Sequence, residues 1–182
     1  APNHQTLSGG TMRKISTGLV ILVCCAAIPA SGSAQQAASP GSFDMPETSE
    51  ADLRADEMHD RATALQSDAR TFAAAARLHM RVANLRDASD PRAVQSLSLA
   101  TALFWHSGRL GGAAAAADAA AARALGIVDV FTAANRNVDR AVIAAGLGDR
   151  EGARSACQRA HLLSLSPHLT TAQREHIRGR IR

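Results

Sequence analysis

From Ser49 to the C-terminus, apolar residues recur every three or four positions, the period of an amphipathic helix. Runs of β-branched residues are missing and aromatic residues make up only 3% of the chain, so no segment is predicted to be a strand. The pattern divides into seven helices joined by short connections. Their expected ranges are 49–65, 68–86, 91–106, 110–125, 129–146, 149–166 and 170–181.

Capping residues mark the ends of these helices. Ser49 precedes two acids that suit the first turn of a helix, and Asp90 precedes Pro91, which suits the first helical position. Thr170 is followed three residues later by Gln173, the spacing of a capping box. Short connections require neighbouring helices to run antiparallel. The sequence therefore predicts an all-α fold of antiparallel helix hairpins.

The expected helix at 110–125 consists almost entirely of alanine. At about 100° per residue, four alanines fall close to one line along it: Ala113, Ala117, Ala120 and Ala124. The preceding helix places bulkier residues on one stripe: Leu97, Thr101 and Phe104. Small side chains facing bulky ones predict a close approach of the two helices. The other alanines are expected only to favour helix formation, and the two glycines at 111–112 cost least in the first turn.

The alanine-rich segment recurs 40 residues later in the chain. Gly108, Ala113 and Ala120 align with Gly148, Ala153 and Ala160. An earlier copy, displaced by 37 residues, places Ala76 and Ala83 at the two small positions. A period of this size in helix pairs indicates a solenoid of stacked hairpins.

These residues resemble the tetratricopeptide repeat (TPR) family over roughly 50–181. In that family a glycine between the two helices is followed by small residues five and twelve positions later, as after Gly108 and Gly148. Phe104 stands where the family has a first-helix aromatic, and Pro167 lies near the repeat-ending proline. The chain departs from the family in spacings longer than about 34 residues and in Ala144, which replaces the aromatic of the third unit. The resemblance implies an antiparallel helix-hairpin solenoid of about three TPR-like pairs plus a C-terminal capping helix.

The N-terminal region has the order of a secretory signal peptide. A basic pair at 13–14 is followed by an apolar run at 18–28 and by small residues up to Ala34. The apolar run is shorter than the roughly 20 residues that cross a bilayer. We therefore expect a signal peptide with an upstream extension at 1–34, a disordered linker at 35–48 and a TPR-like helical domain at 49–182, exported to the periplasm or secreted. Val23, which precedes Cys24, disfavours a lipid anchor there.

The charge is polarised along the chain, which carries a formal net charge of +4. Residues 44–60 hold seven acids and one arginine, whereas residues 136–182 hold nine arginines and four acids. Such polarity can orient subunits or partners, although a solvated surface is the simpler interpretation. Export and the near absence of lysine disfavour nucleic acid as a partner. Cys157, the only cysteine after the signal, lies on an apolar stripe and is expected to be buried without a disulfide.

No motif of a catalytic or metal site is present in the sequence. It contains no glycine-rich phosphate loop, no GxSxG and no HExxH, and none of its seven histidines forms a ligand pair. The histidines are expected to lie on the surface. We therefore expect no enzyme activity, no cofactor, no metal and no membrane span in the mature chain.

The TPR resemblance implies that the first helix of each pair lines a concave surface. The residues placed there are Gln95, Ser98, Trp105, His106 and Asn135. Polar side chains on that surface can grip a peptide backbone, and a tryptophan is a typical anchor. Burial of Trp105 between repeat units is the competing interpretation. The predicted function is a non-catalytic scaffold that binds a protein or peptide partner. A structural protein that self-associates through its helix faces, as a homodimer, is the alternative.

Overall fold

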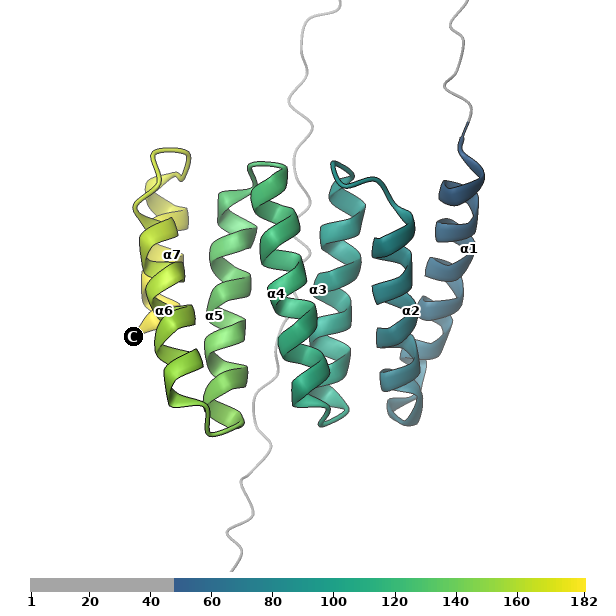
Figure 1. The fold of residues 1–182 in the computed structure, drawn as a ribbon, viewed down its shortest axis with the longest axis horizontal. Helices are drawn as coiled ribbons and strands as arrows, with labels where there is room; N and C mark the ends of the chain where they lie inside the picture. Colours follow the sequence, from purple (N-terminus) through teal and green to yellow (C-terminus); the bar gives the residue numbers. More distant parts are fainter. Residues whose placement is uncertain (1–47) are drawn as a thin grey trace, which may run out of the picture. The chain divides into compact units, whose positions relative to one another are not determined.

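The computed structural model describes residues 48–182, and this part of the chain contains helices and turns but no strand (Figure 1). The helices are α1 (Glu50–Ala64), α2 (Phe72–Leu85), α3 (Pro91–His106), α4 (Leu110–Gly126), α5 (Val130–Gly146), α6 (Arg150–Ser164) and α7 (Thr171–Ile181). The all-α prediction is confirmed. The predicted signal peptide and all but the last residue of the predicted linker lie outside the described residues.

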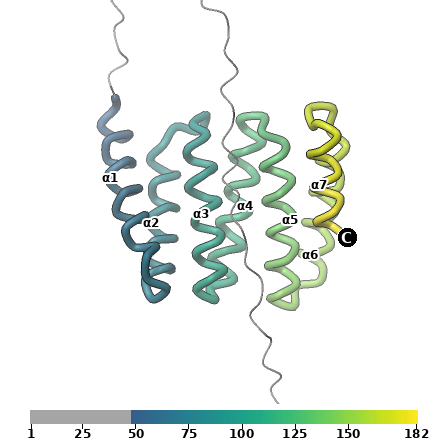
Figure 2. Tube along the Cα trace, turned by 180° about the vertical axis from the view of Figure 1, so that it is seen from behind, coloured from purple at the N-terminus to yellow at the C-terminus, as the bar shows by residue number. Residues whose placement is uncertain are grey.

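Each helix packs mainly against the helices that precede and follow it in the chain. The helices therefore stand side by side in sequence order from α1 to α6, with alternating directions (Figure 1). The last helix, α7, turns back to contact both α6 and α5, and it lies in front of α6 when the chain is seen from behind (Figure 2). The predicted antiparallel packing of chain neighbours is confirmed.

The predicted caps form at most helix ends. Ser49 Oγ accepts a hydrogen bond from the Asp52 N–H, and Thr170 and Gln173 make both bonds of a capping box. The start of α2 differs from the prediction, because Asp68 accepts the Arg70 N–H and begins a 3-10 turn instead of an α-helix. Two such turns, Leu65–Ser67 and Ala69–Thr71, join α1 to α2.

The alanine line of α4 is buried as predicted. The four alanines of this line are fully buried: Ala113, Ala117, Ala120 and Ala124. The bulkier residues of α3 are almost fully buried: Leu97, Thr101 and Phe104. The prediction that the other alanines only favour the helix is wrong for three of them, since Ala114, Ala116 and Ala121 are also buried. They are buried because α4 packs against α5 as well as α3.

Gly112 is required by the close approach of α3 and α4. A Cβ atom at this position would lie 3.0 Å from the Phe104 ring. The glycine therefore makes room for an aromatic residue of the facing helix. It also lies in the first turn of α4, where the entropic cost of a glycine is small.

One turn geometry recurs every 20 residues, at positions 108, 128 and 148. Gly108, Val128 and Gly148 have φ angles of 72°, 61° and 76°. After each of them, the next N–H bonds to a carbonyl five residues earlier: Arg109 to Phe104, Asp129 to Ala124 and Asp149 to Ala144. These bonds belong to the Schellman motif, which ends a helix with a left-handed residue. They set the starts of α4, α5 and α6 at 110, 130 and 150.

Val128→Gly is expected to raise the free energy of unfolding by about 0.5–1 kcal/mol. A left-handed conformation costs an ordinary residue roughly 1–2 kcal/mol, part of which is offset by the larger chain entropy of an unfolded glycine. The valine side chain is 64% exposed, so little burial is lost. Urea unfolding followed by circular dichroism measures the change. Gly148→Val, the reverse substitution at the matching turn, is expected to destabilise, and a loss of stability in Val128→Gly would contradict this account of the turn.

Candidate interaction surface

Four of the five predicted partner-binding residues lie on α3. Gln95 and His106 are exposed, whereas Ser98 and Trp105 are half-buried. The spacing of Gln95, Ser98, Ala102, Trp105 and His106 follows the helical period, so they line one outward side of α3, which we call the α3 face. The Ser98 hydroxyl donates to the Val94 carbonyl at 2.9 Å, which leaves its lone pairs for a partner.

Trp105 has features both of a surface anchor for a partner and of a residue buried between helices. Its side chain packs against the buried cluster that contains Leu103, Phe104 and Ala113, and part of it stays in contact with solvent. A half-buried indole has one apolar side fixed by the core and another available to a ligand.

Asn135 lies apart from the other four residues. It is only 6% exposed and sits on α5 beneath α7. Its amide donates to the Phe131 carbonyl at 3.0 Å, and its Oδ1 accepts from Arg180 Nη1 at 2.8 Å. Arg180 also binds Asp139. Asn135 is therefore a buried link between α5 and α7 and cannot contact a peptide on the α3 face.

A groove between α2 and α4 was missed by the sequence analysis, which considered only the first helix of each pair. It has a volume of about 400 Å³. Its lining residues are Met80, Asn84, Ala88, Leu97, Ala119, Ala122, Arg123 and Gly126. Leu97 of α3 is almost fully buried and forms the floor, because α3 packs against both α2 and α4.

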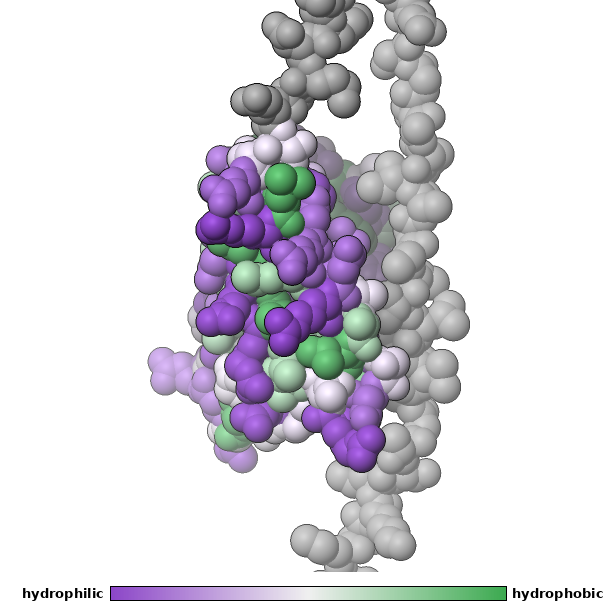
Figure 3. Space-filling model, turned by 90° about the vertical axis from the view of Figure 1, so that its right-hand side faces the viewer, coloured by the Kyte–Doolittle hydropathy of each residue, from purple (hydrophilic) through white to green (hydrophobic). Residues whose placement is uncertain are grey.

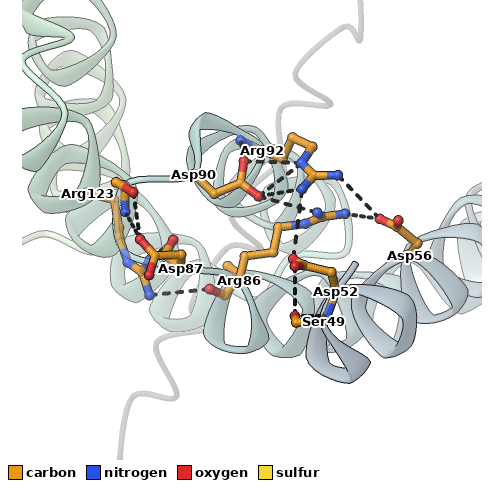
Figure 4. Close-up of polar contacts among 10 residues, drawn as sticks. Ser49, Asp52, Asp56, Arg86, Asp87, Asp90, Arg92 and Arg123 are labelled. Atoms are coloured by element: carbon orange, nitrogen blue, oxygen red, sulfur yellow. Dashed lines mark hydrogen bonds and ion pairs between the residues drawn. The ribbon is translucent and has the colours of Figure 1, made fainter. Parts of the chain in front are cut away.

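A cluster of ion pairs ties α1, α2 and α3 together at one end of the helices (Figure 4). Arg86, which follows α2, has a side chain only 3% exposed and pairs with Asp56 of α1 and with Asp90. Arg92 of α3 pairs with Asp90 at 2.9 Å and reaches Asp52 of α1 at 3.9 Å. The cluster gives α1 and α3 a direct connection that does not pass through α2.

The carboxylate of Asp90 is held in its charged form within this cluster. Burial would raise the pKa of Asp90, but the backbone N–H and guanidinium of Arg92, together with Arg86, bring the pKa below its ordinary value. Asp90 also accepts the Arg92 N–H at 2.8 Å as the cap of α3. One side chain therefore starts a helix and pairs with two arginines.

Arg123 connects α4 to the end of α2 and fixes one wall of the groove. Its guanidinium donates to the Asp87 carbonyl at 3.0 Å and to the Ala83 carbonyl at 3.3 Å. These carbonyls lie at the C-terminal end of α2, where a cation is favoured by the helix dipole.

His79 of α2 is fully buried, so the prediction of a surface histidine is wrong at this position. Its Nε2 lies 2.7 Å from Gln66 Nε2. Its ring packs edge-on against that of His59, with the two ring centroids 5.3 Å apart. Its Nδ1 has no hydrogen-bond partner in the described residues. Burial, reinforced by His59, lowers the pKa of His79 to about 4. His79 is therefore a neutral part of the contact between α1 and α2.

The prediction that Cys157 is buried is also wrong. The side chain is half-buried because it lines a second groove, of about 450 Å³, near the contact of α6 with the end of α7. Gln158, His161, Leu162 and Ile181 line the same groove. Ile181, at the end of α7, is the one lining residue that does not belong to α6, so the apolar stripe of α6 stays partly open here.

Residues 48–182 contain no group of three or more His, Cys, Asp or Glu side chains placed to hold a metal ion. None of the helices in that range is long and apolar enough to cross a membrane. The features that stand out are surfaces: the α3 face and the two grooves. Comparisons with protein-family models, with curated proteins and with solved structures find no match to the chain.

Proposed function

We propose that the protein is an exported, non-catalytic scaffold of TPR-like helix hairpins that binds a protein or peptide partner. Two features support a repeated hairpin. The left-handed turns inside the expected hairpins carry glycine, at Gly108 and Gly148, whereas the equivalent turn between the hairpins carries Val128, and α4 and α6 begin 40 residues apart. Because each repeat contacts mainly its neighbours, such a stack keeps extended surfaces open to a partner.

The observation that carries the proposal is the composition of the α3 face. Most of its polar groups are exposed, while the tryptophan beside them is held in place by the core. An anchor whose conformation is already fixed loses little entropy when a partner binds, and Trp is one of the residue types enriched at binding hot spots. Gln95 can donate to and accept from the backbone of a bound segment, and His106 can add one hydrogen bond at the other end of α3.

The alternative function, self-association, is supported by a different part of the surface. Leu162 and Leu165, at the end of α6, are 66% and 54% exposed. By contrast, the end of the molecule formed by α1 is mostly hydrophilic, with small hydrophobic areas (Figure 3). Self-association would therefore use the α6 side, and a second copy is the partner that this alternative requires. Gel filtration with light scattering separates the two functions, since a monomer favours the scaffold and a dimer favours assembly.

The proposed function is tested by comparing capture on two baits. Purified protein and a variant with Gln95→Ala, Trp105→Ala and His106→Ala are immobilised and exposed to periplasmic extract or culture medium. We expect the unmodified protein to retain a partner that the variant retains at least tenfold less. Circular dichroism checks that the variant is folded. Equal retention by both baits, or no retained partner, contradicts the α3 face as the binding surface.

A further inference from the structure

We propose that the groove between α2 and α4 binds an amphipathic, acidic α-helix of a partner protein. This inference goes beyond the proposed function because it uses another side of the molecule. Leu97, at the floor of the groove, is two residues and therefore about 200° around α3 from Gln95 on the α3 face. Binding at one surface does not require binding at the other.

The shape of the groove fits a helix. Apart from Arg123, the residues of its α4 wall are small, namely Ala119, Ala122 and Gly126, so a partner backbone can approach to the 8–10 Å typical of packed helices. Met80 of α2 and Leu97 supply larger apolar contacts. The two helices that border the groove run in the same direction, since one antiparallel helix, α3, separates them in the chain. A third helix can lie along the channel with an apolar stripe at i, i+3 and i+7 facing inward.

The charge around the groove selects an acidic partner. Arg77 and Arg81 are exposed on α2, three residues before the lining residues Met80 and Asn84 respectively, so each projects from the same side of the helix as a lining residue. Neither arginine forms an ion pair within the described part of the chain. Arg123 lies on the α4 wall as well, but its charge is partly offset by the nearby Asp87 carboxylate.

The acids near the groove leave the charges of Arg77 and Arg81 unpaired. Asp118 on α4 is paired with Arg140 at 3.0 Å. The Asp87 carboxylate, at the end of α2, accepts hydrogen bonds from Ser89 and lies close enough to Arg123 to offset part of that charge, but it forms no ion pair with Arg77 or Arg81 in the described residues. The α2 rim therefore presents unpaired guanidinium groups beside an apolar floor. Glutamates flanking the apolar stripe of a partner helix would complement both features.

The test uses a defined probe. A synthetic, fluorescein-labelled helix of about 18 residues, five turns long, carries leucine and alanine on one face and glutamate on its flanks. Its binding to the purified protein is followed by fluorescence anisotropy. A second peptide replaces every glutamate with lysine. We expect saturable binding of the acidic peptide, which weakens as salt is raised, and at least tenfold weaker binding of the lysine peptide.

Matched variants test where on the protein the peptide binds. Ala122→Trp blocks the groove and is compared with Ala102→Trp, because both alanines are exposed but only Ala122 lines the groove. Arg81→Glu is compared with Arg178→Glu, at another exposed arginine. We expect Ala122→Trp and Arg81→Glu to weaken the acidic peptide at least tenfold and fivefold, and the two controls to change its affinity less than twofold. Circular dichroism spectra confirm that all four variants are folded.

Several results would overturn the inference. They are absence of saturable binding, equal binding of the lysine peptide, and equal effects of Ala122→Trp and Ala102→Trp. A peptide that is displaced by Ala102→Trp alone binds the α3 face, which contradicts the groove while leaving the proposed function intact. Chemical-shift changes in the ¹⁵N spectrum of the unmodified protein provide a check that needs no variant, since they are expected at Asn84, Ala119 and Ala122.

Discussion

Ala117→Leu is expected to lower the free energy of unfolding by about 3 kcal/mol. Ala117 is fully buried in the cluster that contains Leu103 and Phe104 of α3. The three added carbons have no space between the helices, so they force α4 away from α3 or force side chains out of their preferred rotamers. Urea unfolding followed by circular dichroism gives the change in stability.

Ala115→Leu is the matched control for this prediction. Ala115 lies two residues away on the same helix but is exposed, and surface substitutions of this kind change stability by only about 0.5 kcal/mol. The comparison removes any effect of leucine on helix propensity, because both sites lie inside α4. If Ala117→Leu were tolerated as well as Ala115→Leu, the close approach of α3 and α4 would be contradicted.

Acidification from pH 7 to pH 4 is expected to cost the protein about 3 kcal/mol of stability through His79 alone. Above its ordinary pKa of 6.5, His79 is neutral in both the folded and the unfolded chain. Below pH 6.5 the unfolded chain takes up a proton, while the buried ring, whose pKa is lowered to about 4, does not. The stability is therefore fully present above pH 6.5 and is lost progressively as the pH falls to 4. Urea midpoints measured across this range report the loss.

His79→Gln removes the titrating group and is expected to flatten this part of the stability profile. His176→Gln is the control, since His176 is exposed on α7, where its ring lies beside that of Phe131. The quantity compared is the slope of the free energy of unfolding against pH between pH 6.5 and pH 4. A general loss of stability in His79→Gln shifts the whole curve and does not change this slope. An unchanged slope in that variant would show that other groups control the acid sensitivity.

Local sequence signals predicted the helices well because those signals act over a few residues. Asp90 before Pro91 and Thr170 before Gln173 specify helix starts through bonds within one turn. The turn at Val128 carried no such signal, since a β-branched residue is unexpected in a left-handed conformation. The structure adopts it there because the Schellman bond from Asp129 to Ala124 fixes the turn.

The buried polar residues were harder to predict because their surroundings come from distant parts of the chain. Asn135 is covered by Arg180, which lies 45 residues later. His79 offered a clue that was not used, because it follows Ala75 and Ala76 at helical spacing and precedes the buried Val82 and Ala83. The groove between α2 and α4 depends on how far α3 separates them, a distance that no local pattern encodes.

The order of packing along the chain is the central claim, and contacts between methyl groups test it most directly. In a nuclear Overhauser spectrum of protein labelled at alanine, leucine, isoleucine and valine methyls, we predict cross-peaks between Leu97 and Ala120, which share a buried cluster. We also predict cross-peaks between Val130 and Ile177, which share another. Absence of the first pair, or cross-peaks joining Ala62 of α1 to Ala141 of α5, would contradict a fold in which helices pack in sequence order.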